Sequence, residues 1–95
     1  MAGTITLPRP ELLDTPVDNS ANWIVIVYDN DHNTFQEVTE ILQAATGCSL
    51  EEAQMETWEV HHLGRSLVHH DNQEECERVA RIIRTIGIRV AVDQV

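Results

Sequence analysis

Residues 23–28 read Trp-Ile-Val-Ile-Val-Tyr, six β-branched or aromatic residues in succession with no charge among them. A run of this length and composition is typical of a central β-strand and is too short for a buried helix. The cluster that follows, residues 29–33, is Asp-Asn-Asp-His-Asn, which is rich in residues that favour turns. The sequence therefore predicts a buried strand over 23–28 that ends in a polar turn.

A helical pattern follows this turn. Either Asn33 or Thr34 is expected to cap the helix, and Gly47 is expected to end it. The apolar positions that recur at helical spacing are Phe35, Val38, Ile41, Leu42 and Ala45.

A second helix is predicted to begin at a capping box, in which Ser49 is the cap and Glu52 lies three residues on. We expect it to extend to about His61. Its expected inner face carries Leu50, Ala53, Thr57 and Val60.

Three further elements are predicted in the second half of the chain. Residues 64–68 are typical of a short strand. Asp71 and Glu74 have the spacing of a cap pair and are expected to begin a third helix, which Gly87 is expected to end. Residues 88–92 alternate as a last strand. The apolar positions of the third helix are Val79, Ile82, Ile83 and Ile86.

The predicted order, β-α-α-β-α-β, indicates an α/β class of fold, more closely an α+β sandwich. In it, a three-stranded sheet carries three helices packed on one face. Ninety-five residues make one small domain. Because the first 20 or so residues contain three prolines and no sustained apolar period, we expect 1–21 to be a flexible N-terminal extension and 22–95 the folded domain.

Composition excludes several classes of function. A net charge of −10 argues against binding to nucleic acid or to an anionic membrane surface. No apolar run approaches the ~20 residues of a membrane span, and the N-terminus lacks the features of a secretory signal. Cys48 and Cys76 fit no metal-type spacing, so we expect two reduced thiols in a cytoplasmic protein.

The acidic and amide residues after the first strand are a candidate binding site. An ammonium group has three donors, which an acidic oxygen, an amide oxygen and a neutral imidazole nitrogen can accept together. Asp29, Asn30 and His61 supply these three types, provided that the fold brings the first turn and the end of the second helix together. The alternative is that residues 29–31 only form the turn and cap the next helix.

The five histidines raise a second hypothesis, that of a metal or metabolite site. They comprise the adjacent pairs His61-His62 and His69-His70, with His32 apart. Adjacent residues point in different directions, and zinc sites usually pair histidines at wider spacing or recruit thiolates. We therefore expect no metal and no cofactor.

Three arginines, Arg78, Arg81 and Arg84, fall on one stripe of the third helix, opposite its apolar positions. Such a stripe is usually only a solvated face, but on so acidic a chain it is also a candidate docking surface. We find no phosphate-binding glycine loop, no nucleophile with an obvious base and no catalytic carboxylate pair. The sequence therefore favours a binding protein over an enzyme.

These motifs, taken in order, resemble those of the ClpS family, the adaptors of the ATP-dependent Clp protease. The resemblance covers roughly residues 23–92 and is greatest to the actinobacterial and cyanobacterial branch. It is carried by the strand from Trp23, by Asp29-Asn30-Asp31, by Asn33, Phe35 and Val38, by Val60-His61-His62 with Gly64-Arg65, and by the closing run 87–92.

The resemblance implies a non-enzymatic adaptor that binds N-degron substrates, whose N-terminal residue is bulky and apolar, and delivers them to the N-terminal domain of a Clp AAA+ unfoldase of the ClpA or ClpC type. It implies that Asp29, Asn30 and His61 hold the substrate's α-amine and that the extension takes part in delivery. The unfoldase is then the partner for which the arginine stripe is a candidate docking surface. The implied pocket for the first side chain is lined by Asn33, Phe35, Val38, Ile41, Thr57, Val60 and Ile88.

The chain departs from the family pattern at three of these positions. Asp29 then Asn30 reverses the common order of amide and acid, and Thr57 and Phe35 each replace a common methionine. The smaller Thr57 implies a roomier pocket with looser specificity. The alternative is an interaction module of the same fold that binds the unfoldase without recognising N-degrons.

Overall fold

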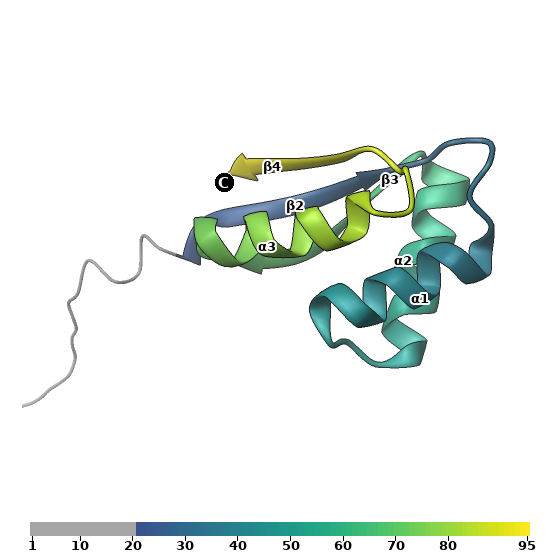
Figure 1. The fold of residues 1–95 in the computed structure, drawn as a ribbon, viewed down its shortest axis with the longest axis horizontal. Helices are drawn as coiled ribbons and strands as arrows, with labels where there is room; N and C mark the ends of the chain where they lie inside the picture. Colours follow the sequence, from purple (N-terminus) through teal and green to yellow (C-terminus); the bar gives the residue numbers. More distant parts are fainter. Residues whose placement is uncertain (1–20) are drawn as a thin grey trace, which may run out of the picture.

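Six elements make up residues 21–95, the part of the chain that the computed structural model describes (Figure 1). They are β2 (Trp23–Tyr28), α1 (Phe35–Thr46), α2 (Leu50–Leu63), β3 (Arg65–Asp71), α3 (Gln73–Arg84) and β4 (Val90–Gln94). The order β-α-α-β-α-β and the α+β class are confirmed. The extension predicted for residues 1–21 lies outside the described residues, apart from Ala21.

The apolar run of residues 23–28 forms the central strand of the sheet, whose order is β3-β2-β4. Both neighbours are antiparallel to β2, so that Val27 lies opposite Ser66 on one side and Val90 on the other. Because side chains alternate between the two faces of a strand, Val25 and Val27 point into the core and are fully buried.

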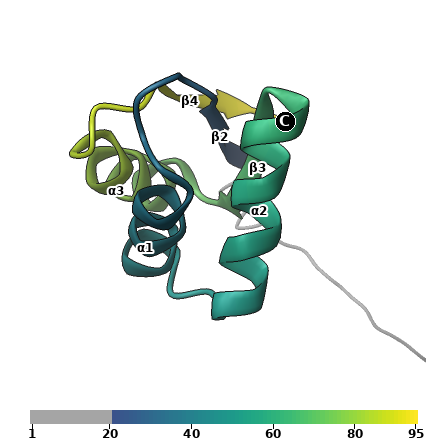
Figure 2. The same cartoon turned by 90° about the vertical axis from the view of Figure 1, so that its right-hand side faces the viewer.

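The helices cover this buried face of the sheet. Helix α3 lies along the sheet and contacts all three strands, and α1 packs against both α2 and α3 (Figures 1 and 2). The fully buried side chains of the core come from both layers: Val25, Val27, Val38, Leu42, Thr57, Val60, Cys76, Val79 and Ile83.

Of the two predicted caps of α1 the structure selects Thr34, and α2 begins at the predicted Ser49. Thr34 accepts a hydrogen bond from the Glu37 amide at 3.1 Å while the Glu37 carboxylate accepts one from the Thr34 amide at 2.9 Å, a complete capping box. Ser49 likewise accepts from the Glu52 amide at 3.1 Å. Gly47 ends α1 in the left-handed conformation, with φ of 75°.

Several predicted boundaries were wrong, and backbone pairing explains most of the differences. Strand β3 continues through Asp71, which pairs with Trp23, because the polar residues beyond Val68 keep their backbone hydrogen bonds to β2. The cap of α3 is therefore Asn72, one residue later than predicted. Helix α3 ends at Arg84, so Gly87 lies in the following turn.

The predicted inner face of α2 also needs correction. The helix runs to Leu63, so His61 and His62 are in its last turn, and Leu50, its first residue, is 52% exposed. Glu56 is buried instead, and its Oε1 accepts no hydrogen bond within the described part of the chain. Burial, with a smaller contribution from the charges of Glu52 and Glu59, raises the pKa of Glu56 to about 7.

Candidate functional site

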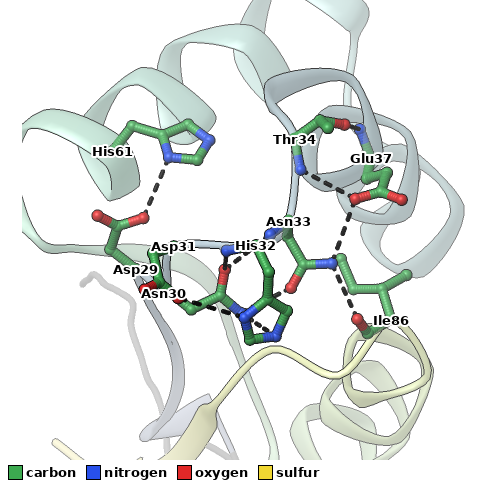
Figure 3. Close-up of polar contacts among 9 residues, drawn as sticks. All are labelled: Asp29, Asn30, Asp31, His32, Asn33, Thr34, Glu37, His61 and Ile86. Carbon is green, nitrogen blue, oxygen red and sulfur yellow. Dashed lines mark hydrogen bonds and ion pairs between the residues drawn. The ribbon is translucent and has the colours of Figure 1, made fainter.

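The loop between β2 and α1 meets the C-terminal end of α2 at one rim of the molecule (Figure 3). The Asp29 amide donates to the Gly64 carbonyl at 3.0 Å, and the Tyr28 amide donates to the Arg89 carbonyl at 3.0 Å. Gly64 has a φ of 92°, a conformation that allows the chain to leave α2 sharply. These two bonds fix the start of the loop beside the last turn of α2.

An imidazole and a carboxylate meet at this rim. Nδ1 of His61 lies 3.1 Å from Oδ1 of Asp29, and their side chains are 22% and 35% exposed. A carboxylate can only accept, so Nδ1 carries the proton in this contact, and in the neutral ring Nε2 keeps a lone pair. Nε2 is buried and bonds to no other group among residues 21–95. The site thus pairs an anionic acceptor with an imidazole whose second nitrogen is unused.

An exposed aromatic ring lies against this pair. The rings of Phe35 and His61 stack with their centroids 5.9 Å apart and their planes 25° apart. Phe35 is 42% exposed. An apolar surface therefore adjoins the imidazole.

Asn30 is turned into the loop. Its Oδ1 accepts from the Asn33 amide at 3.0 Å and from the His32 amide at 3.3 Å, and its Nδ2 donates to Asn33 Oδ1 at 2.7 Å. Because a carbonyl oxygen has two lone pairs, Asn30 is occupied in this conformation. Asp31 points to solvent, where it contacts His32. Asp29 is accordingly the acceptor that the loop presents towards His61.

Asn33 connects this loop to the turn between α3 and β4. Its Nδ2 donates to the Ile86 carbonyl at 2.9 Å and to Glu37 Oε1 at 3.3 Å (Figure 3). The hydrogen bonds that Glu37 receives, first from the Thr34 backbone and then from Asn33, lower its pKa, so this carboxylate stays charged. Glu37 is not among the predicted site residues, although its capping-box spacing from Thr34 is visible in the sequence.

The other predicted pocket residues do not form one cavity. Val38, Thr57 and Val60 are fully buried, and Ile88 is 4% exposed. The Thr57 hydroxyl donates to the Ala53 carbonyl at 2.7 Å and accepts from Thr39 at 2.9 Å, so it is engaged between α1 and α2.

Ile41 lies elsewhere, in a cavity that it lines together with Glu37, Glu40, Ala44 and Ile86. Of the predicted site, the structure therefore brings together Asp29, His61 and Phe35. It buries Val38, Thr57, Val60 and Ile88 in the core and places Ile41 on another face of α1.

The arginines of α3 have structural contacts as well as exposed surface. Arg78 pairs with Glu75 and donates to the Ala45 carbonyl of α1 at 3.3 Å. Arg84 donates to the Val90 carbonyl of β4 at 3.0 Å, and Arg81 is exposed. Two of the three therefore also join α3 to its neighbours.

The other histidines contact different residues: His32 lies near Asp31, His69 near Asp71 and His62 against Trp58. His62 stacks on Trp58, with centroids 4.4 Å apart, and its Nδ1 lies 2.9 Å from the Trp58 carbonyl. Across residues 21–95, no three His, Cys, Asp or Glu side chains are grouped so that they would hold a metal ion. None of the helices in that same range has the length and apolar character that crossing a membrane requires.

Fold and site together define a small single-sheet α+β domain whose site is built from one loop and one helix end. Residues 18–89 match the family described as ATP-dependent Clp protease adaptor protein ClpS. The chain belongs to the ClpS family, the adaptors of the ATP-dependent Clp protease.

Known members of the family are similar to most of the chain. The ClpS adapter protein of Streptomyces coelicolor is 31% identical over 72 residues, which cover 76% of this chain and 75% of that protein. The ClpS adapter protein of Streptomyces avermitilis is 28% identical over 102 aligned positions, which cover 97% and 96% of the two chains.

A solved structure of ClpS2 from Agrobacterium tumefaciens, bound to L-phenylalaninamide, has the same fold. Its TM-score is 0.72 at 16% identity, and the match covers 77% of this chain and 95% of that one. This likeness concerns the fold of the domain.

Proposed function

We propose that this chain is a cytoplasmic, non-enzymatic adaptor that binds N-degron proteins by their first residue and delivers them to a Clp AAA+ unfoldase. The observation that carries the proposal is the Asp29–His61 pair beside the exposed ring of Phe35. An anionic and a neutral acceptor next to an apolar surface match a free α-amine and a bulky first side chain. The L-phenylalaninamide bound to ClpS2 has both of these groups.

In the proposed complex the ammonium enters between Asp29 and His61 and donates to the carboxylate and to Nδ1, with the imidazole in its other neutral tautomer, whose proton is on Nε2. Asn30 shapes the loop that presents Asp29, and a rotation of its amide would supply the third acceptor. The first side chain packs on Phe35, which turns aside to admit it towards Val38, Val60 and Ile88. Rotamer changes of this kind are common when interfaces form.

The energetics of these contacts fit an adaptor that has to release its cargo. One buried apolar side chain contributes ~1.5–3 kcal/mol. Each hydrogen bond to a charged group contributes ~1.5–3 kcal/mol before association costs are subtracted. We therefore expect micromolar affinity.

A fluorescence-anisotropy titration tests the proposal. Labelled peptides that differ only in residue one should bind when it is Leu, Phe, Tyr or Trp and bind poorly when it is Ala or Ser. Acetylating the Leu peptide should abolish binding, because the positive charge and two of the N–H donors disappear together. Equal affinity across the series would refute N-degron recognition.

Delivery needs a surface for the unfoldase, and we assign it to the arginine stripe of α3. Arg81 is the best probe, because it is exposed while Arg78 and Arg84 also hold the fold together. Arg81→Glu should weaken binding to the isolated N-terminal domain of a ClpA- or ClpC-type unfoldase and leave Leu-peptide binding unchanged. Undiminished unfoldase binding would place the docking surface elsewhere.

A second candidate function is an interaction module that binds the unfoldase without N-degrons. Two observations favour it: Asn30 Oδ1 is already occupied, and Thr57 is buried and hydrogen-bonded. Unfoldase binding by a chain that ignores every N-terminal peptide would support this alternative.

A further inference from the structure

A groove runs along α1 on the side that faces the α3–β4 turn. It encloses about 280 Å³, and its walls are Glu37, Glu40, Ile41 and Ala44 of α1 with Ile86 of the turn. The four α1 residues have the spacing i, i+3, i+4, i+7, so they form one stripe about 10 Å long on a single helix face. We call this feature the α1 groove.

The α1 groove has an apolar floor and an acidic rim. Ile41, Ala44 and Ile86 provide the floor, and the half-buried Ile41 and Ile86 also pack against the core. Glu37 and Glu40 provide the rim. Carboxylates three residues apart on a helix repel each other, so a cation between them is favoured.

Both carboxylates are held in place. Glu37 is fixed by the Thr34 amide and by Asn33, the same contacts that keep it ionised. Glu40 accepts from Gln36 Nε2 at 3.0 Å and is otherwise exposed to solvent. The rim therefore presents two oriented negative charges.

We propose that the α1 groove is a docking site for an arginine or lysine side chain of a protein partner. A long basic side chain places its aliphatic stem on apolar surface while its head stays at a polar rim. The planar guanidinium of arginine suits two carboxylates best. The volume lies just below the ~300–1,000 Å³ of small-molecule pockets, so it suits one side chain. The net charge of −10 draws basic partners from a distance.

This site is distinct from the proposed amine site, although Glu37 of its rim also bonds to Asn33 of the adjoining loop. Neither Asp29 nor His61 lines it, and its ligand needs no free α-amine. A partner can therefore occupy the α1 groove while the N-degron site is either empty or filled.

An NMR titration of the full chain tests the inference with Nα-acetyl-argininamide, whose blocked amine removes it from the N-degron site. Millimolar additions should shift the backbone amides of Glu37, Glu40, Ala44 and Ile86. Nα-acetyl-citrullinamide, which has the same shape without the charge, should bind roughly five-fold more weakly, the upper effect of an exposed charge pair. Equal affinity for the two probes, or no shifts at these residues, would overturn the inference.

Two variants locate the site and one serves as control. Glu40→Gln should weaken binding of the arginine probe by roughly three- to five-fold. Ala44→Leu should abolish its binding by filling the groove from an exposed helix position that tolerates leucine. Glu51→Gln, an exposed site on α2 outside the groove, should leave it unchanged. Wild-type affinity in both groove variants would also overturn the inference. Failure of this test leaves Leu-peptide binding unaffected, so the two proposals are judged separately.

Discussion

His61 and His62 are neighbours in the sequence with different surroundings in the fold. His61 lies against Asp29 and Phe35 in the candidate site, whereas His62 stacks on Trp58. Replacing each in turn compares two imidazoles of the same helix turn, one inside the site and one outside it.

We expect His61→Ala to weaken binding of an N-terminal Leu peptide by about 10- to 100-fold. The lost hydrogen bond to the ammonium is of the charged class, worth ~1.5–3 kcal/mol. His62→Ala should change the affinity by less than about two-fold, the range of surface substitutions. Anisotropy titrations measure both, and thermal unfolding confirms that each variant is folded. Equal losses in the two variants would contradict a specific role for His61.

Glu56 gives the chain a pH-dependent stability. Its pKa is about 7 in the folded protein against a reference value of 4.5. The folded state therefore binds more protons than the unfolded state between these values. By linkage, the free energy of unfolding falls as pH rises from about 4.5 to about 7 and is flat above that range as far as Glu56 is concerned.

We expect Glu56→Gln to remove this component. The variant should match the wild type near pH 4 and be more stable than it at pH 8, by on the order of 1–3 kcal/mol. Urea unfolding at the two pH values measures the difference. Glu51→Gln, at an exposed position of the same helix, should show no such change with pH. A constant difference between Glu56→Gln and wild type would contradict a raised pKa.

Among the elements, α1 begins at a cap that also holds the candidate site. Thr34 and Glu37 close the capping box, and Glu37 bonds to Asn33 within the loop. We expect Thr34→Ala to lower the free energy of unfolding by about 1 kcal/mol, the usual cost of losing an N-cap.

Ser49→Ala, at the equivalent cap of α2, should cost a similar amount. Because only Thr34 adjoins the loop, only Thr34→Ala should also weaken Leu-peptide binding. Denaturant unfolding measures the effect on stability, and anisotropy measures the effect on peptide binding. Equal peptide affinity in both variants would show that the cap at Thr34 does not support the candidate site.

The elements themselves were predictable because helix and strand periods are visible in the sequence. Ser49 was predicted as a cap, and Thr34 as one of two alternatives with Asn33, because capping is local. Asn72 was missed because the extent of β3 depends on backbone pairing with β2, which side-chain patterns do not encode. Buried Glu56 was missed because its hydrophilic side chain does not mark a core position.

The candidate site was predictable only in part. The types of residue at Asp29, Asn30 and His61 suggested an ammonium site, and the structure brings Asp29 and His61 to 3.1 Å; their role remains a prediction. The inward turn of Asn30 depends on its side-chain rotamer. The hydrogen bond from Asn33 to Ile86 joins residues that are 53 positions apart, so no local sequence pattern predicts it.

At the scale of the whole molecule, residues 22–95 contain the sheet, the three helices and the core. We expect this segment, produced alone, to unfold cooperatively with a stability within about 1 kcal/mol of the full chain. Its Leu-peptide affinity should also be retained, while delivery of a substrate to the unfoldase should slow. Circular dichroism, anisotropy and a degradation assay measure these quantities. A loss of folding or of peptide binding would make residues 1–21 part of the domain.

The position of β2 in the sheet sets the order in which the protein can form during synthesis. β2 is made before both of its neighbours, and one of these is β4, the last of the described elements; the Val95 amide bonds to the Asn22 carbonyl at 2.8 Å. Pairing between such distant segments is slow, and an unpaired strand invites wrong partners. On the ribosome, one edge of this apolar strand therefore stays unpaired until residues 90–94 have been translated and have left the exit tunnel.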